Sequence, residues 1–215
     1  MIAIHYTALS PVFELNVFHS PEALMEYDYF SIESILAENQ KLQCTFKYDI
    51  PDMGHLGGGN ERDIKMLSKR QIPLWLAYTI IYSDWADFSI PTPFNAKVRN
   101  ALKAEPRSVR LSSLVGSGGL WYGFGKAVMD ILDDDQAEEM SDAMTKAFRG
   151  RLTEIVDQAQ HFAALGPVGG GSSSGDSAQL FREGLDGTER ELFGLAQEST
   201  KRSKRWYEES NKGRR

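Results

Sequence analysis

From residue 72 onward, apolar residues recur at spacings of three and four, the period of helices that bury one face. The stripe is longest over residues 147–162, and a shorter one covers residues 120–132. One last helix is expected to carry the apolar residues Phe181, Leu185, Leu192, Phe193 and Ala196. Pro73 and Pro93 stand where the first turns of two further helices are expected, because proline suits that position. This pattern restricts the chain to folds that are helical over most of their length.

The chain before residue 72 has a different character. Residues 43–48 alternate between polar and apolar side chains, the period of a half-buried strand, and Pro51 ends the pattern. Residues 29–36 suggest a strand running into one helical turn, and the glycine-rich, charged stretch 54–70 predicts a mobile loop. A unit of about 45 residues is marginal for independent folding, so we expect it to pack against a neighbouring domain.

The predicted fold class is therefore α+β, mostly α. A small N-terminal β-rich domain at residues 25–71 is followed by a larger α-helical domain at residues 72–210. Residues 166–177 are rich in glycine and serine and predict a flexible linker, and residues 211–215 form a tail. Residues 1–24 contain no Lys or Arg and no secretory-signal pattern. We expect them to be either a disordered extension outside both domains or an upstream start that is not used.

Composition excludes several classes of protein. The longest nearly unbroken apolar run, residues 74–81, is far shorter than the roughly 20 residues of a bilayer span, so no membrane segment is expected. Asp plus Glu is 30 and Lys plus Arg is 24, a net charge of -6 that argues against a general nucleic-acid coat. The single cysteine, Cys44, permits no internal disulfide and fits a reducing, intracellular compartment.

A cluster of glycines at residues 116–125, followed by Lys126, invites comparison with a phosphate-binding loop. That motif is G-x-x-x-x-G-K-[ST], whose backbone amides surround phosphates while the hydroxyl holds Mg²⁺. Here Leu120 stands where the first glycine should be, and Ala127 replaces the hydroxyl residue. We therefore interpret the glycines as positions that allow close helix packing.

Other candidate chemistry is equally weak. The acidic run at residues 130–142 lacks the ligand spacing of a calcium loop, and we expect it to be solvated and to cap a helix, with contact to a basic partner surface as the second possibility. No G-x-S-x-G motif occurs, and the histidines are scattered without metal-ligand spacing. They are His5, His19, His55 and His161. No catalytic, cofactor-binding or metal-binding residue is predicted.

The C-terminal part of the chain carries a compact basic cluster. Its members are Lys201, Arg202, Lys204 and Arg205. Such a cluster can act as a nuclear import signal or a weak nucleic-acid contact, but cations near a helix C-terminus also stabilise the helix dipole. The sequence leaves these readings open.

Large aromatic residues are frequent in the helical segments, and aromatics dominate both protein cores and interface hot spots. The candidates for a partner interface or a core position are Trp75, Trp121, Tyr122, Phe124, Phe193 and Trp206. Sequence alone does not separate the two roles.

Several stretches together point to a family. In chain order they are YFSIESIL (29–36), CTFKYDI (44–50) with Pro51, IPLWLA (72–77), YGFG (122–125), FRGRLTEIVDQ (148–158) and LDGTERELF (185–193) with Arg205-Trp206. This ordered set resembles the third Psf-type subunit of GINS, the four-protein complex of the eukaryotic replicative helicase.

The resemblance implies a small β-rich domain followed by a larger helical one, with no catalytic activity and no cofactor. It implies a heterotetramer with three other GINS subunits, which joins the MCM hexamer and a Cdc-type partner in the CMG helicase. It further implies a nuclear location and a DNA contact that is at most indirect or weak.

The chain departs from the family at a few places. Residues 1–24 have no counterpart, and residues 54–70 and 166–177 resemble variable insertions. Gly187 stands where a strong helix former is expected, at a cost of about 1 kcal/mol relative to alanine.

The leading hypothesis is thus a non-catalytic scaffold subunit. The alternative is a DNA-binding module that uses the basic C-terminal cluster. Phosphate binding weakens steeply as salt rises, whereas an apolar interface hardly responds, so salt dependence separates the two.

Overall fold

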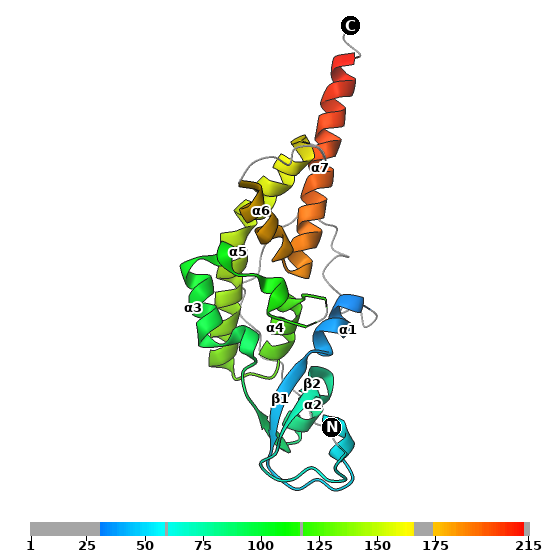
Figure 1. Ribbon diagram of the computed structural model, residues 1–215, viewed down its shortest axis with the longest axis vertical. Coiled ribbons are helices and arrows are strands. Elements are labelled where there is room, and N and C mark those ends of the chain that lie inside the picture. Colours follow the sequence, from blue (N-terminus) through cyan, green and yellow to red (C-terminus); the bar gives the residue numbers. More distant parts are fainter. Residues whose placement is uncertain (1–30, 59, 117, 166–173, 213–215) are drawn as a thin grey trace, which may run out of the picture.

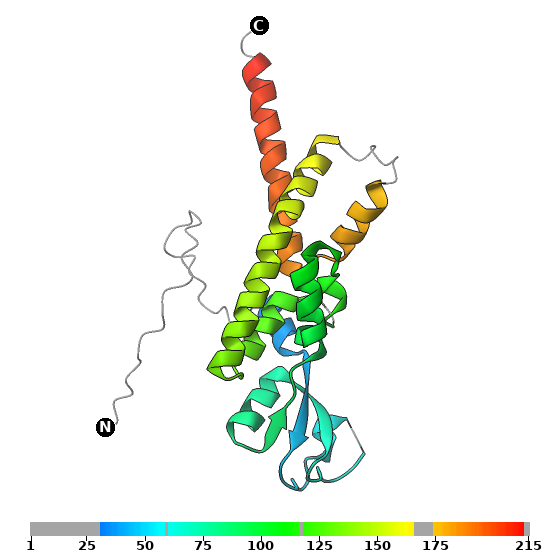
Figure 2. The same ribbon diagram turned by 90° about the vertical axis from the view of Figure 1, so that its left-hand side faces the viewer.

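The computed structural model describes residues 31–58, 60–116, 118–165 and 174–212. A small sheet lies at one end of the molecule, a group of packed helices follows, and the last helix projects at the far end (Figures 1 and 2). The predicted class, α+β and mostly α, is confirmed. The predictions for residues 1–24, for the first part of the linker and for residues 213–215 lie outside the described residues.

The sheet has three antiparallel strands. β1 (Lys41–Phe46) lies between β2 (Lys69–Pro73) and β3 (Ala86–Phe88), in the order β2-β1-β3. The last strand lies beyond residue 71, where we expected the β-rich domain to end. With three residues, β3 is too short to show an alternating pattern in the sequence, and only its pairing with β1 reveals it.

Alternate side chains of β1 are buried, as the sequence pattern predicts. Leu42, Cys44 and Phe46 face the core, and the strand ends at Phe46 rather than at Tyr48. Burial in this core raises the pKa of the Cys44 thiol to about 11.

The segment between β1 and β2 is partly held in the core. Ile64 is fully buried, and its backbone exchanges hydrogen bonds of 2.8 and 2.9 Å with that of Ile50. A 3-10 turn, η2 (Gly54–Gly57), lies between these two isoleucines. The prediction of a mobile loop over residues 54–70 is therefore wrong at Ile64 and at the start of β2, because one buried isoleucine anchors a segment whose composition is otherwise polar.

Two short helices accompany the sheet. α2 (Leu74–Tyr82) packs against the strands, and α1 (Ile32–Glu38) packs against α4 (Trp121–Met129) of the helical domain. The side-chain oxygen of Ser31 accepts a hydrogen bond from the Ser34 N–H at 3.4 Å and so caps α1. The helical turn expected at the end of residues 29–36 is therefore confirmed, while residues 29 and 30, where the preceding strand was expected, lie outside the described part.

The helical domain contains short 3-10 turns and longer α-helices. In chain order they are η3 (Thr92–Phe94), α3 (Ala96–Ala104), η4 (Pro106–Ser108), η5 (Leu111–Ser113), α4 (Trp121–Met129) and α5 (Asp134–Leu165). One hydrophobic cluster runs from the sheet into this domain and includes Phe46, Phe94, Trp121 and Phe124. The β-rich unit thus shares its core with the helices, as its small size predicts.

The acidic run begins α5. Oδ1 of Asp133 accepts a hydrogen bond from the Gln136 N–H at 2.9 Å, and Asp134 and Asp135 lie in the first turn. Anionic side chains at this end oppose the helix dipole favourably, so the capping role is confirmed.

The glycine cluster serves backbone geometry and packing. Gly118 and Gly119 have φ values of 96° and 60°, which side chains disfavour. A Cβ added at Gly125 would lie 2.6 Å from Sδ of Met144, so this glycine allows α4 and α5 to approach closely. The interpretation as packing positions is confirmed at Gly125.

The final helical segment is two helices rather than one. α6 (Ser174–Glu183) and α7 (Gly187–Lys212) are separated by a short turn, and α6 includes residues 174–177 of the predicted linker. Gly187 is the first residue of α7, and its N–H donates to the Gly119 carbonyl at 3.0 Å. The expected cost of a mid-helix glycine therefore does not apply.

Candidate protein-protein interface

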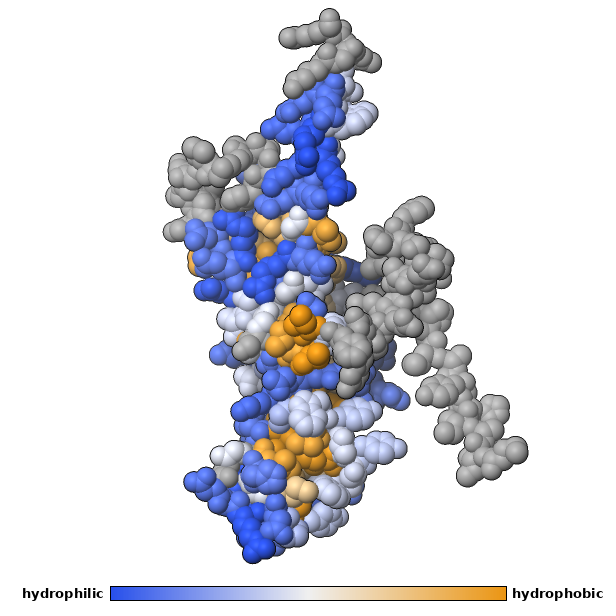
Figure 3. Space-filling model, turned by 90° about the vertical axis from the view of Figure 1, so that its right-hand side faces the viewer, coloured by the Kyte–Doolittle hydropathy of each residue, from blue (hydrophilic) through white to orange (hydrophobic). Residues whose placement is uncertain are grey.

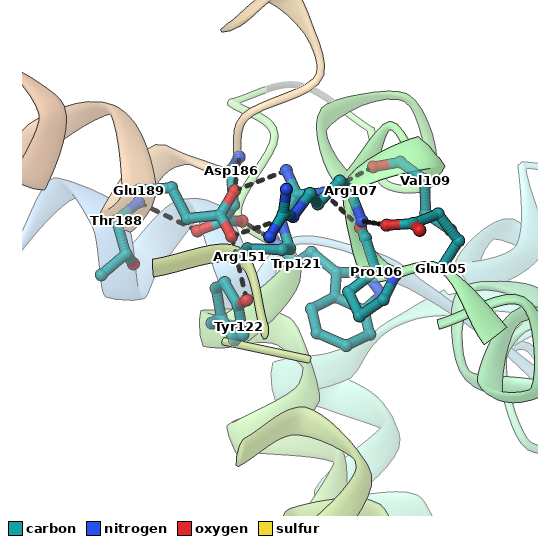
Figure 4. A network of polar contacts seen from close by, with 10 residues as sticks. All are labelled: Glu105, Pro106, Arg107, Val109, Trp121, Tyr122, Arg151, Asp186, Thr188 and Glu189. Atoms are coloured by element: carbon teal, nitrogen blue, oxygen red, sulfur yellow. Dashed lines mark hydrogen bonds and ion pairs between the residues drawn. The ribbon is translucent and has the colours of Figure 1, made fainter. Parts of the chain in front are cut away.

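A buried ion pair fixes the start of α7 against α5. Nε and Nη2 of Arg151 donate to the two carboxylate oxygens of Glu189 at 2.7 and 3.0 Å, and both side chains are fully buried (Figure 4). Nη1 of Arg151 donates to the carbonyls of Pro106 and Val109 at 2.7 and 2.8 Å. One guanidinium thus joins α5, α7 and the η4 turn through a bidentate pair.

The same carboxylate completes the N-terminal cap of α7. Oε2 of Glu189 accepts from the Asp186 N–H at 3.0 Å, and Oδ2 of Asp186 accepts from the Thr188 N–H at 2.9 Å. Oδ1 of Asp186 also accepts from the Trp121 N–H, which ties α4 to the cap. The D-G-T-E sequence at 186–189 is a capping-box pattern, a signal that the sequence analysis overlooked.

Burial changes the titration of this network. It raises the pKa of the Tyr122 hydroxyl, and the neighbouring Glu189 carboxylate raises it further. Burial also raises the pKa of Asp186, opposed by hydrogen bonds from Thr188 and Trp121. Tyr122 therefore stays protonated and donates to Glu189 at 3.1 Å. Because Arg151, Asp186 and Glu189 are closed off from solvent, we assign the network a structural role: it orients α7.

Four of the candidate aromatics are in or beside a hydrophobic cluster. Trp121 is 1% exposed and Phe124 is buried with it, while Nε1 of Trp121 donates to the Pro93 carbonyl at 3.1 Å. Tyr122 is half-buried and packs edge-on against Trp121. Phe193, also half-buried, packs against a second cluster under α7. None of these four aromatic side chains is fully exposed to solvent.

Trp75 belongs to an exposed aromatic face on α2. Trp75, Tyr78 and Tyr82 are exposed and follow at intervals of three and four residues, which places them on one side of the helix. Figure 3 looks onto the side that carries α1 and α2 and shows apolar patches over both, with polar side chains between them. Exposed aromatic clusters of this kind are typical of protein-protein contacts. We call these three residues the α2 aromatic face.

Trp206 lies at the other end of the molecule, on the projecting part of α7. Its ring makes an edge-on contact with Tyr207, with centroids 4.9 Å apart, and both residues are more than 60% exposed. The basic cluster is exposed on the same helix, where Arg202 pairs with Glu198 at 2.7 Å. Its role in import or nucleic-acid binding stays a prediction.

A groove of about 690 Å³ lies between α1, α4 and the start of α7. Leu36, Ala37, Leu120 and Ala127 supply apolar lining, and charged side chains such as Arg190 also line it. Among the described residues, no group of His, Cys, Asp and Glu is arranged to hold a metal ion. Within the same residues, no helix has the length and apolarity needed to cross a bilayer.

Two family models match the chain in succession. The model described as PSF3 N-terminal domain matches residues 30–82, and the model described as GINS complex protein helical bundle domain matches residues 93–208. The first match includes α1, β1, β2 and α2, and the second covers the helical domain through Trp206.

Similar proteins carry related names. The chain is 35% identical over 190 residues to "DNA replication complex GINS protein psf3" of Aspergillus fumigatus, which covers 86% of this chain and 98% of that protein. It is 34% identical over 166 residues to the protein of that name from Schizosaccharomyces pombe, with 77% and 89% covered. The Saccharomyces cerevisiae protein PSF3 is 27% identical over 194 residues, with 83% and 97% covered.

Proposed function

Because the chain belongs to the Psf3 family of GINS complex subunits, we propose that it is a non-catalytic scaffold in the replicative helicase. In this role it assembles with three other GINS subunits, and the complex joins the MCM ring to a Cdc-type partner. The family places the chain in DNA replication. The joining of the MCM ring to the Cdc-type partner is the part of this function that we propose.

One observation carries the proposal: exposed aromatic side chains lie at two distant ends of the molecule. The α2 aromatic face is beside the sheet, and Trp206 with Tyr207 is on the projecting end of α7 (Figure 1). A subunit that bridges partners needs separate contact surfaces, and large exposed aromatics supply the binding energy of such surfaces. The buried Arg151–Glu189 pair supports the arrangement, because it sets the direction of α7.

The joining role can be tested by reconstitution. Purified GINS complex, with and without this chain, is mixed with the MCM ring and the Cdc-type partner, and their recovery together is measured. We expect joint recovery only when this chain is present. Equal recovery in its absence would contradict the scaffold function.

The α2 aromatic face can be tested in the same assay. Replacing Trp75, Tyr78 and Tyr82 together by alanine removes three exposed rings and should lower recovery about tenfold or more. Lys103→Ala, an exposed change on α3, is the matched control and should leave recovery unchanged.

DNA binding through the basic cluster is the second candidate. Lys201, Arg202, Lys204 and Arg205 are all exposed within five positions, which favours an electrostatic contact. Glu198, Glu208 and Glu209 on the same helix weaken the local positive field. If DNA binding is real, affinity should fall steeply between about 50 and 200 mM salt and should be lost when the four cations become alanine.

We also propose a nuclear location, since the relatives are DNA replication proteins. A fluorescent fusion of the full chain tests this. If the basic cluster is the import signal, replacing its four cations with alanine should move the fusion to the cytoplasm, whereas Glu208→Ala should not.

A further inference from the structure

The second half of α7 stands free of the rest of the described molecule. The helix continues beyond the end of α5 (Figures 1 and 2), and every residue from 201 to 210 is exposed. An isolated helix of this length is marginal in water, because tertiary packing supplies most helical stability. A helix that projects in this way is therefore stabilised when another surface covers it.

The residues of this half are sorted by charge around the helix. At 100° per residue, the uncharged side chains from residue 199 to residue 210 fall within one arc about 120° wide. They are Ser199, Thr200, Ser203, Trp206, Tyr207 and Ser210. The charged side chains occupy the remaining arc. They are Lys201, Arg202, Lys204, Arg205, Glu208 and Glu209. The division is complete, although this half contains few aliphatic residues.

The uncharged arc continues a surface that is already used for packing. Earlier in α7, where the helix packs against α5, Leu192, Ala196 and Thr200 are half-buried. Leu192 and Ala196 lie in line with the uncharged arc, since both sets share the 3.6-residue period. After α5 ends at Leu165, no other part of the described chain covers the same side of α7, which continues to the Trp206–Tyr207 pair.

From this geometry we infer that the uncharged arc, with Trp206 and Tyr207 as its anchors, is the docking surface for an α-helix of another GINS subunit. This inference rests on the proposed scaffold function and names the surface that serves it. The small serine side chains let a second helix approach closely, and the two rings supply a large apolar contact. The arc spans about 16 Å from Ser199 to Ser210, the length of roughly three helical turns.

Charge defines the chemistry of the partner helix. Residues 201–210 contain four basic and two acidic side chains, and Arg202 and Lys204 border the arc on its two sides. The partner helix should therefore have an apolar stripe flanked by acidic residues, which complements this border.

A competition experiment tests the inference directly. The three other subunits are co-expressed with equal amounts of wild-type chain and of a double variant, Trp206→Ala with Tyr207→Ala, that carries a different tag. The ratio of the two tags in the purified complex measures relative affinity. We expect the variant to be under-represented about tenfold or more.

The matched control is Lys201→Ala with Glu208→Ala, which removes one cation and one anion from the opposite side of the same turns. It should enter the complex as often as wild type. Both variants should keep the circular dichroism and thermal unfolding of the isolated chain, because all four side chains are exposed.

Other outcomes overturn the inference. Equal incorporation of the Trp206/Tyr207 variant would show that the arc is uncovered in the complex, while the scaffold function would still stand. Equal loss of both variants would indicate general sensitivity of the helix rather than a docking surface. Self-association of the isolated chain that depends on Trp206, without an effect on the complex, would assign the arc to a second copy. If wild-type chain itself failed to enter the complex, the proposed function would fail first.

Discussion

Two tryptophans of the candidate set occupy opposite environments, and this difference decides what each contributes. Trp121 is 1% exposed and packs against Phe94 with ring centroids 5.3 Å apart, whereas Trp206 is 62% exposed. A buried ring contributes to the stability of the isolated chain. An exposed ring contributes only when a partner covers it.

Trp121→Ala should lower the free energy of unfolding of the isolated chain by about 3–5 kcal/mol, because it leaves a large cavity and an unpaired Pro93 carbonyl. Trp206→Ala should change it by less than about 0.5 kcal/mol. Urea unfolding followed by circular dichroism measures both. Comparable losses of unfolding free energy for the two variants would contradict this assignment, because they would mean that the Trp206 ring packs against the rest of the chain.

Two glycines provide a second residue-scale comparison. A Cβ at Gly54 would lie 1.9 Å from the Glu61 backbone carbonyl oxygen, whereas a Cβ at Gly194 meets nothing within 4 Å. Gly54→Ala should destabilise the chain by about 1–3 kcal/mol, since the backbone of the loop must shift. Gly194→Ala should stabilise it by up to about 1 kcal/mol through helix propensity. Thermal unfolding of both variants checks the opposite signs.

At the scale of elements, the buried Arg151–Glu189 pair connects helices that are distant in the sequence. Glu189 serves at once as the ion-pair partner of Arg151, the acceptor for Tyr122 and part of the α7 cap. Removing one partner leaves the other buried without its counter-charge. The position of α7, and so of its exposed arc, depends on this pair.

Arg151→Ala should therefore destabilise the chain by about 3–5 kcal/mol. Arg202→Ala is the matched control, because it breaks the exposed pair with Glu198 on α7 and should cost no more than about 0.5 kcal/mol. Denaturant unfolding compares the two variants. A small effect of Arg151→Ala would show that the ion pair does not hold α7 in place.

Elements that carry an apolar pattern over several residues were predictable from sequence. A three-residue strand and the break between two successive helices were not. The apolar stripe at 147–162 correctly indicated α5, and the alternation around Cys44 indicated β1. β3 was missed because three residues carry no pattern. The break between α6 and α7 was missed because the apolar period continues across it, although the capping box at 186–189 marks the start of α7.

The candidate contact residues were predictable as a set but not by role. Sequence named Trp75, Trp121 and Trp206 together, and only burial separates the core ring from the exposed ones. Arg151 was overlooked because it is a charged residue within an apolar stripe. Its partner comes from 38 residues further along the chain, which no local pattern reveals.

At the scale of the whole molecule, the chain places aromatic contact surfaces at two ends of an elongated body. The α2 aromatic face lies beside the sheet, and the arc of α7 lies at the projecting end (Figures 1 and 2). One shared core connects the sheet to α4 and the start of α5, and the buried Arg151–Glu189 pair joins α5 to the start of α7. This architecture suits a subunit that is completed by its partners.

Co-expression of this chain with the three other GINS polypeptides, followed by size-exclusion chromatography with mass determination, tests whether the chain is a subunit of a heterotetramer. We expect one species that contains each of the four polypeptides once. A 24.1 kDa monomer that elutes apart from the other three subunits would contradict it.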